Sequence, residues 1–351
     1  MNSATSAPTA VRARPTLRDV AVLAGVSTKT ASRVVNGEPG VSPSKIAAVQ
    51  RAVTQLDYRP NFTASSLRRA GGRSAAIAAV LEDLANPFSA ALHRALEDAA
   101  RERQVLIFAG SVDENPQRER DLVRAFTMRQ ADALVVVPAS DDQSYLMTEI
   151  NAGTPVVFVD RPPAGLSVDA VLTDNHDGAA AAVHHLVRHG HREIAYLGDL
   201  QTIPTARQRF QGFKEALSDH GIRPAPANIV HDLHTERDAE GAVRRLLATD
   251  APPTALFTSQ NLVTIGAIRA LQQLGRQQQI ALVGFDDFPL ADLLQPAVTV
   301  IAQNPSEMGQ VAAALIFRRL DGEQWHPTAH LVATRLIPRG SGEILGPHYG
   351  R

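Results

Sequence analysis

Apolar residues recur at helical spacing in the first 60 residues of the chain. Gly25 follows the first such stretch and suits the positive φ that ends a helix, while Ser27 is placed to cap a second helix. Ser42 followed by Pro43 indicates the start of a third helix. The inward-facing stripes are Leu17, Val20, Ala21 and Ala24, then Ala31, Val34 and Val35, then Ile46, Val49, Val53 and Leu56. We therefore predict three short helices between residues 17 and 56.

A different pattern begins at residue 74, where short apolar runs alternate with longer amphipathic stretches. The runs cover residues 76–81, 105–109, 133–137, 156–159, 194–197, 255–258 and 280–284. Helical patterns between them include residues 87–103, 177–189, 209–220 and 262–274. This alternation predicts parallel sheets covered on both faces by helices. More than 250 residues with this pattern are too many for one sheet with a single hydrophobic core, so we predict two α/β subdomains.

The junctions between these patterns divide the chain into five parts. They are an N-terminal tail (1–14), a small all-α head (15–60), a short helix with a linker (61–73), an α/β body (74–341) and a C-terminal tail (342–351). Asn61 is placed to cap a helix over residues 62–69, which is too short to be stable alone. The glycines at 71 and 72 predict a flexible joint after it.

Charge is distributed unevenly along the chain, although the net charge of the 351 residues is only −1. Through residue 73 there are eleven Lys and Arg against three Asp and Glu, a net charge of +8. The remaining residues carry 24 basic and 33 acidic side chains, a net charge of −9. A small basic segment joined to an acidic body indicates a polyanionic partner for the first part only. A basic solvated tail would give the same counts, so charge alone leaves both interpretations open.

Composition excludes several classes of function. The chain has no Cys, which excludes disulfides, Cys-based zinc sites and Cys nucleophiles. Residues 1–14 lack the apolar core of a secretory signal peptide, and no stretch approaches the length of a transmembrane helix. We therefore expect a cytoplasmic protein without a membrane partner.

The first two predicted helices have the makeup of a helix-turn-helix, with the small Ala21 where the helices would cross. If the apolar stripe of the second helix faces inward, its outer face carries Thr28, Lys29, Ser32 and Arg33. These side chains suit the DNA major groove, because Lys and Arg bind guanine O6 and N7 and hydroxyls bind base edges or phosphates. The alternative is a three-helix protein-binding bundle with a solvated basic face.

Residues 16–67 resemble the DNA-binding head of LacI-type transcriptional regulators. The matching order is T-L-x-D-V-A-x-x-A-G-V-S, S-R-V-x-N, V-S, L-x-Y-x-P-N and A-x-x-L. The resemblance implies that Thr28, Lys29, Ser32 and Arg33 are the recognition-helix contacts to DNA.

The same resemblance implies that residues 61–69 form a hinge helix that folds on operator DNA. Asn61 and Arg68 would contact the DNA, and Leu67 would wedge into the minor groove. An apolar side chain in a basic segment can unstack a base step while neighbouring arginines hold phosphates. Packing against its twin or against the body is the alternative role for Leu67.

The resemblance continues to about residue 341 through N-P-F at 86–88, F-V-D-R at 158–161, R-F-Q-G-F at 209–213 and V-G-F-D-D at 283–287. It implies a periplasmic-binding-protein-like fold of two Rossmann-like lobes with an effector cleft between them. Lobe 1 is expected at about 74–171 and 303–330, and lobe 2 at about 172–302 and 331–341. The implied effector-binding residues are Asn86, Phe88, Asp160, Arg209, Gln260, Asp286 and Gln303. Any one of them could instead be part of a turn or a helix cap.

Two departures from the family pattern bear on the effector. Many members have Asn-Asp where this chain has Gln260 and Asn261, and some have an aromatic where it has Pro305. The loss of a carboxylate and of a stacking surface disfavours an ordinary neutral sugar. Arg161 and Arg209 would then suit a more anionic ligand, so a sugar or a sugar acid is expected.

Four histidines lie close together in sequence, at positions 184, 185, 189 and 191. His185 and His189 are four residues apart and could share a helix face as zinc ligands do, but the 190–191 pair matches an ordinary turn of the family. No glycine-rich phosphate loop follows the first strand and no G-x-S-x-G nucleophile motif is present. We expect no metal, no cofactor and no enzymatic activity.

Together these features predict a sequence-specific transcriptional regulator, a repressor switched allosterically by a small molecule. One short helix reads too few bases for specificity, so a homodimer on a pseudo-palindromic operator in double-stranded DNA is expected, on the nucleoid when bound. A solute-binding protein for sugar transport or sensing would share the cleft without binding DNA. A small-molecule enzyme on an α/β scaffold is the third alternative.

Overall fold

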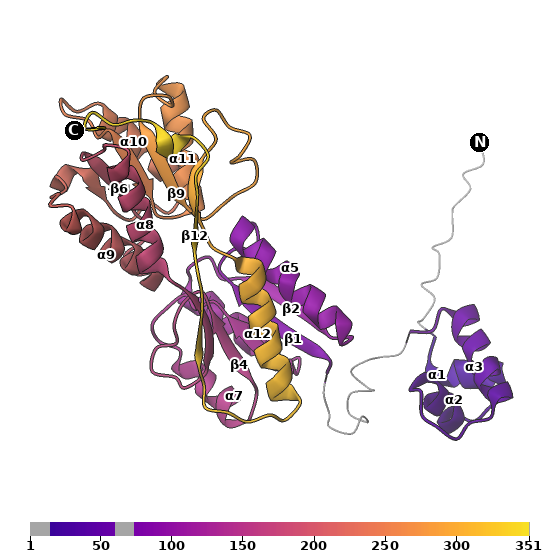
Figure 1. The fold of residues 1–351 in the computed structure, drawn as a ribbon. Helices are drawn as coiled ribbons and strands as arrows, with labels where there is room; N and C mark the ends of the chain where they lie inside the picture. Colours follow the sequence, from indigo (N-terminus) through magenta and orange to yellow (C-terminus); the bar gives the residue numbers. More distant parts are fainter. Residues whose placement is uncertain (1–14, 60–73, 351) are drawn as a thin grey trace, which may run out of the picture. The chain divides into compact units, whose positions relative to one another are not determined.

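The computed structural model describes residues 15–59 and 74–350, and the chain forms two compact units, Met1–Ser74 and Ala75–Arg351. Figure 1 shows the helical unit in indigo and the α/β body in purple to yellow. Among the described residues, no helix is long and apolar enough to cross a membrane.

The small unit contains the three predicted helices. They are α1 (Leu17–Ala24), α2 (Thr28–Val35) and α3 (Pro43–Leu56). Their core consists of small and branched apolar side chains, which lets helices this short pack closely. Its fully buried members are Val20, Ala21, Ala31, Val49 and Ala52. The predicted helices are thereby confirmed.

The ends of these helices follow their capping residues. Gly25 ends α1 with a φ of 65°, and the Ser27 hydroxyl accepts a hydrogen bond from the Thr30 amide at 3.1 Å. Ser42 occupies the N-cap position of α3, but its side chain makes no capping hydrogen bond and lies 3.3 Å from the Ser44 hydroxyl. The predicted start of α3, with Ser42 at the N-cap and Pro43 in the first helical turn, is therefore confirmed, although the Ser42 hydroxyl is turned to its neighbour and not to the helix amides.

Lobe 1 of the body is a parallel sheet with the strand order β11-β5-β4-β3-β1-β2. The strands are β1 (Ala76–Leu81), β2 (Leu106–Ser111), β3 (Ala133–Val136), β4 (Val156–Val159), β5 (Asp169–Thr173) and β11 (Ala329–Val332). The helices are α5 (Pro87–Glu102), α6 (Pro116–Thr127), α7 (Met147–Asn151) and α12 (Pro305–Leu320), with a 3-10 turn at Ser144–Leu146. Alternate residues of β1 pack on α5 and α12 on one face and on α6 on the other.

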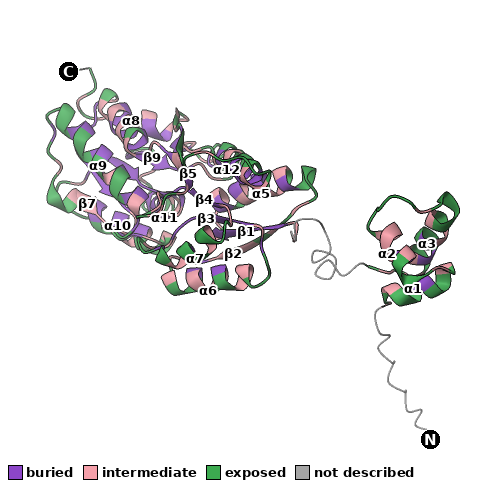
Figure 2. Ribbon diagram, turned by 90° about the horizontal axis from the view of Figure 1, so that it is seen from below, coloured by how far each residue is buried: buried purple, intermediate pink, exposed green. Residues whose placement is uncertain are grey.

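Lobe 2 repeats this arrangement with the order β12-β10-β9-β8-β6-β7, parallel except for the pair β10 and β12. The strands are β6 (Ile194–Leu197), β7 (Ile229–Val230), β8 (Ala255–Thr258), β9 (Ala281–Phe285), β10 (Thr299–Ala302) and β12 (Arg335–Ile337). The helices are α8 (Asn175–Arg188), α9 (Pro204–Asp219), α10 (Glu236–Leu247) and α11 (Asn261–Gln273), with 3-10 turns at Pro226–Asn228 and Ser341–Glu343. Figure 2 shows buried residues along the strands and exposed residues on the outer helix faces.

Two sheets covered by helices confirm the predicted pair of α/β subdomains, and every predicted apolar run forms a strand. The sequence pattern missed β5, β7, β10, β11 and β12. β7 and β12 have only two and three residues, and Ala329, His330 and Leu331 of β11 are exposed, so these three strands lack the continuous apolar run that marked the others. β5 and β10 are as long and nearly as buried as the strands that the pattern revealed.

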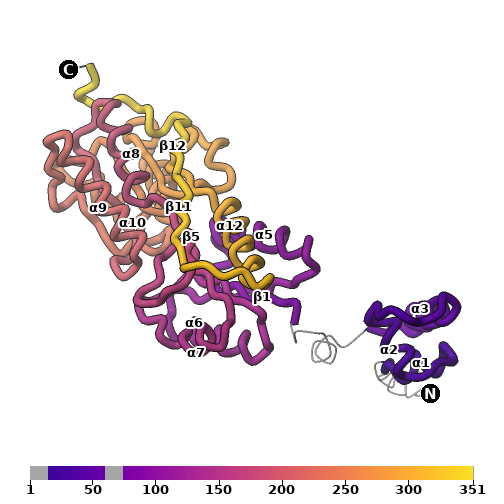
Figure 3. Tube along the Cα trace, turned by 60° about the horizontal axis from the view of Figure 1, so that its bottom comes forward, coloured from indigo at the N-terminus to yellow at the C-terminus, as the bar shows by residue number. Residues whose placement is uncertain are grey.

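The chain passes between the lobes three times in the described body: from β5 to α8, from β10 to α12, and from β11 to β12. In Figure 3 the yellow C-terminal segment runs along both lobes, and β11 pairs with β5. Short connections of this kind let two packed lobes rotate against each other as units.

The strand order predicts where a ligand would bind. In each lobe the chain order reverses beside the first strand, at β1 and at β6. Ligands of such folds bind beyond the carboxyl ends of the strands at this reversal.

Candidate functional site

The outer face of α2 carries the four residues predicted to contact DNA. Thr28 and Lys29 are exposed, Ser32 and Arg33 are half-buried, and Ala31 on the opposite side is buried. The helix therefore presents polar side chains on one side and packs with the other, as a major-groove reader requires.

Arg33 is held by its own turn. Its guanidinium donates to the Pro39 carbonyl oxygen, and its Nε lies 3.6 Å from a Glu38 carboxylate oxygen. A side chain bound in this way fixes the turn after α2. The sequence pattern did not reveal this role, because the partners lie five and six residues away in a segment without periodicity.

Asn61, Leu67 and Arg68, the predicted contacts of the hinge segment, lie outside the described residues. Their roles stay predictions.

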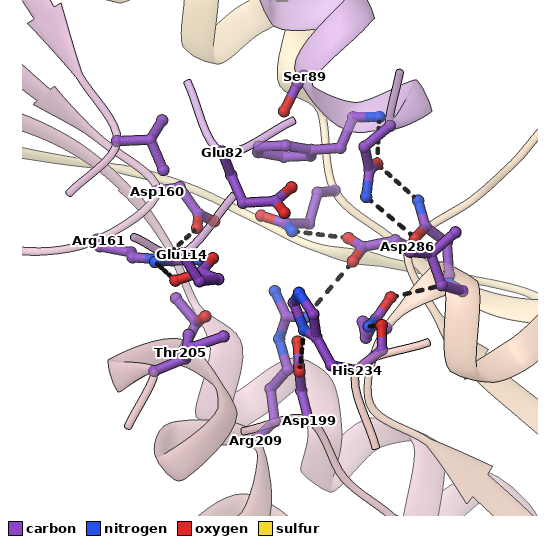
Figure 4. Close-up of a pocket in the computed structure, with 18 residues that line it drawn as sticks. Glu82, Ser89, Glu114, Asp160, Arg161, Asp199, Thr205, Arg209, His234 and Asp286 are labelled. Carbon is purple, nitrogen blue, oxygen red and sulfur yellow. Dashed lines mark hydrogen bonds and ion pairs between the residues drawn. The ribbon is translucent and has the colours of Figure 1, made fainter. Parts of the chain in front are cut away.

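A cleft of about 580 Å³, including its open mouth, lies between the two lobes of the body (Figure 4). The structure brings together all seven residues predicted for effector binding, which are Asn86, Phe88, Asp160, Arg209, Gln260, Asp286 and Gln303. The first three belong to lobe 1 or its connections, and Arg209, Gln260 and Asp286 to lobe 2. A ligand in the cleft would therefore touch both lobes.

Asp160 and Asp286 occupy equivalent positions in the two lobes. Each follows the carboxyl end of a strand with a positive φ, 68° and 69° respectively. Each amide also donates to the neighbouring strand, at Val171 and Ile301, both at 2.9 Å. Asp tolerates this left-handed conformation better than most residues. Burial raises the pKa of both carboxyl groups, and nearby arginines oppose the rise.

Arg209 on α9 is a buried anchor of the cleft. Its Nε donates to the Asn175 side-chain oxygen and its Nη1 to the Ser259 carbonyl, both at 2.7 Å. Its guanidinium lies 3.4 Å from the Asp286 carboxylate and stacks 3.8 Å from the centre of the Phe285 ring. Arg209 thus has its charge balanced before any ligand binds.

The positive charge of Arg161, in lobe 1, is balanced in the same way. Its guanidinium makes two hydrogen bonds to Glu114, at 2.7 and 2.5 Å, and one to the Pro138 carbonyl at 2.8 Å. Asp160 lies 3.6 Å from its Nε. The structure therefore argues against the interpretation of Arg161 and Arg209 as free partners for an anionic ligand, because both are already paired with carboxylates.

The two lobes meet directly through Asn86 and Asn261. Each side-chain amide donates to the other's carbonyl oxygen, at 3.3 and 2.9 Å. Gln260, in contrast, caps α11 by accepting the Leu262 amide at 2.8 Å and donates weakly to the His234 carbonyl. Asn261 therefore bridges the lobes, while the predicted residue Gln260 has a capping role in addition to its place on the cleft wall.

Sequence reasoning missed four titratable residues of the cleft. Glu82 and Asp199 follow the ends of β1 and β6, and Glu114 and His234 lie in the loops after β2 and β7. His234 lies 2.8 Å from Asp199, and this hydrogen bond raises the pKa of the imidazole. Their position after a strand was the signal that could have found Glu82 and Asp199.

The histidine cluster separates only in part, because the rings of His185 and His189 lie 4.4 Å apart, centre to centre, whereas His184 and His191 have other partners. His184 lies 2.8 Å from His220, His185 lies 2.6 Å from Glu343, and His191 contacts the Thr254 hydroxyl and the Ile344 carbonyl. Within the described ranges, no group of three His, Cys, Asp or Glu residues is placed to hold a metal ion.

Two family models match the chain. The lacI family of bacterial regulatory proteins matches residues 16–61, and a periplasmic binding protein-like domain matches residues 183–342. The predicted combination of a helix-turn-helix head and a two-lobe α/β body is thereby confirmed.

Curated relatives match almost the full chain. The ribose operon repressor of Halalkalibacterium halodurans is 30% identical over 329 residues, covering 92% of this chain and 96% of the relative. The transcriptional regulator CelR of Thermobifida fusca is 31% identical over 341 residues, covering 94% and 99%. Both are regulators of transcription by name, and neither is named as an enzyme.

Solved structures show the same architecture. A complex of CelR with cellobiose has a TM-score of 0.69 and 30% identity, covering 93% of this chain and 100% of that one. The lac repressor dimer bound to operator has a TM-score of 0.82 at 24% identity, covering 95% and 100%, and shares the fold.

Proposed function

The chain belongs to the LacI family of bacterial regulatory proteins, and on this basis we propose that it represses transcription from an operator under the control of a small sugar-like effector. The observation that carries the proposal is that one chain joins a helix-turn-helix with a polar outer face to a cleft built by two lobes. A solute-binding protein would need only the second part.

In this proposal α2 is the helix that recognises the DNA sequence. Thr28, Lys29 and Ser32 would contact base edges or phosphates, and Arg33 would set the turn behind them and reach DNA only by leaving Glu38. A homodimer would place two such helices one helical turn apart on a pseudo-palindromic operator. Asn61, Leu67 and Arg68 would complete the contact in the minor groove.

The effector would act through the angle between the lobes. Asp160 and Asp286 are equivalent carboxylates on opposite walls, and Asn86 and Asn261 already join the lobes without ligand. A ligand that binds one lobe arrangement better than the other shifts the population toward it. Since lobe 1 directly follows the hinge segment, such a shift would change how two copies hold their DNA-binding heads.

The test begins with operator selection from random double-stranded DNA by the purified full chain. Fluorescence anisotropy at about 0.15 M salt then measures the affinity for that operator with and without sugars. We expect specific binding at least a thousand-fold tighter than binding to unrelated DNA, and a change of about ten-fold or more with the effector. Binding that does not discriminate between DNA sequences would contradict the proposal and favour a solute-binding protein.

A further inference from the structure

The walls of the cleft carry an excess of negative charge. Five carboxyl groups line it, against the guanidinium groups of Arg161 and Arg209 and the imidazole of His234. Those five are Glu82, Glu114, Asp160, Asp199 and Asp286. Even with His234 protonated, the carboxylates outnumber the cations.

Four of the five carboxylates have a cation in contact. Glu114 and Asp160 share Arg161, Asp286 lies 3.4 Å from Arg209, and Asp199 lies 2.8 Å from His234. Each cationic side chain of the cleft is therefore already in contact with a carboxylate.

Glu82 is the remaining carboxylate. Among the described residues its carboxyl group has neither a hydrogen bond nor an ion pair, although it is half-buried and projects between the two walls (Figure 4). Burial raises its pKa to about 7, the carboxylates of Glu114 and Asp83 add to the rise, and Arg161 and His234 oppose it. A carboxylate withdrawn from water without a counter-ion is unfavourable, and a ligand that supplied the cation would remove this cost.

We propose that the effector is a small polyhydroxylated compound carrying a protonated amine, and that Glu82 binds this amine and so selects it over neutral sugars. The inference rests on the proposed function and names the ligand class of the same cleft. A sugar acid would meet the excess of carboxylates, and a neutral sugar would leave Glu82 without a counter-ion.

The rest of the cleft suits the hydroxyl groups of such a ligand. Asp160 and Asp286 offer acceptors on both walls, and the Gln303 side-chain oxygen is buried without a hydrogen-bond partner among the described atoms. Phe88 supplies an apolar ring surface. Hydroxyl recognition is therefore shared by both lobes, whereas the amine would be recognised from lobe 1, where Glu82 follows β1.

The experiment is calorimetric titration of the full chain at about pH 7. The probes are glucosamine, galactosamine and glucamine, each compared with its neutral hydroxyl parent, together with N-acetylglucosamine and gluconate. We expect at least one amine to bind about ten-fold to one hundred-fold tighter than its parent, since a hydrogen bond to a charged group has a value in this range. N-acetylation should remove the preference because it removes the charge.

Two variants assign that preference to Glu82. Glu82→Gln keeps the size of the side chain and removes its charge, so it should bind amine and parent within about three-fold of each other. Glu102→Gln makes the same change at an exposed position of α5 and should keep the wild-type preference.

The inference is overturned if no amine binds more tightly than its parent, or if the preference survives in Glu82→Gln. Failure of the proposed function would look different. If the chain binds a specific operator and responds only to a neutral sugar, the proposed function stands and the inference about the amine fails. If the chain binds an amine through Glu82 but binds no operator, the proposed function fails and the inference about the amine stands.

Discussion

Replacing Glu82 by Gln should stabilise the ligand-free protein, and only at a pH where Glu82 carries charge. In the folded body, burial raises the pKa of Glu82 from its ordinary value of 4.5 to about 7. Since one pKa unit corresponds to about 1.4 kcal/mol, the charged form is destabilising by roughly 2–3 kcal/mol, allowing for the solvent that still reaches the carboxyl group.

The direction of the pH dependence follows from proton binding. Between pH 4.5 and about 7 the folded protein keeps a proton on Glu82 that the unfolded chain has lost. The contribution of Glu82 to the free energy of unfolding therefore falls as pH rises through this window. Below pH 4.5 both states are protonated, and above about pH 7 the destabilisation is complete. Gln does not titrate, so the difference between the two proteins should grow through the same window.

The assay is thermal unfolding of both proteins without ligand from about pH 4.5 to 8.5, with Glu102→Gln as the matched control. We expect equal midpoints at the acid end and a Glu82→Gln midpoint higher by roughly 4–10 °C above pH 7. His234 also faces Glu82, and its pKa is raised by Asp199, so the comparison is repeated in a His234→Gln background to separate the two titrations. A difference that is constant across the range would refute the reasoning, because it would not come from the charge of Glu82.

Three other predictions concern DNA reading, the cleft anchor and the contact between the lobes. Lys29→Ala should weaken operator binding by about 1–3 kcal/mol without changing the unfolding midpoint, as measured by anisotropy and calorimetry, and unchanged affinity would show that α2 presents another face. Arg209→Ala should abolish the effector response. It should also lower the body's free energy of unfolding by about 3–5 kcal/mol, because it leaves Asp286 buried without its cation. An effector response with wild-type affinity would mean that the cleft is misassigned. Asn261→Ala should remove the hydrogen bonds to Asn86, so the ligand-free lobes should open and the radius of gyration measured by X-ray scattering should increase. An unchanged radius would show that these bonds do not hold the lobes together.

Family motifs predicted part of the cleft from the sequence alone. Asp160, Arg209 and Asp286 stand in the short motifs at 158–161, 209–213 and 283–287 that carry the family resemblance, so their meeting in space could be expected. Glu82 and His234 stand outside such motifs: Glu82 is marked only by its position directly after β1, and His234 by nothing in its neighbours along the chain. Their roles became visible only when the strand ends of both lobes were placed around one volume.

Interpretation of charge by residue type alone was less reliable. Arg161 and Arg209 indicated an anionic ligand as long as their partners were unknown. The structure pairs Arg161 with Glu114, 47 residues away, and Arg209 with Asp286, 77 residues away. Electrostatic preference in a cleft depends on the sum over such contacts, and distance along the chain carries almost no information about them.

The sequence by itself determined the local structure of this protein: three capped helices with a polar face on the second, and apolar runs of strand length alternating with amphipathic helices. These features depend on neighbours within a few residues, where periodicity and capping chemistry act. Only the tertiary structure decided which strands complete each sheet, that Asn86 meets Asn261, and that Glu82 is left without a counter-ion in an acidic cleft. The reason is that these features depend on which distant segments the lobes bring within a few ångströms, and such distances are set by the packing of the whole body.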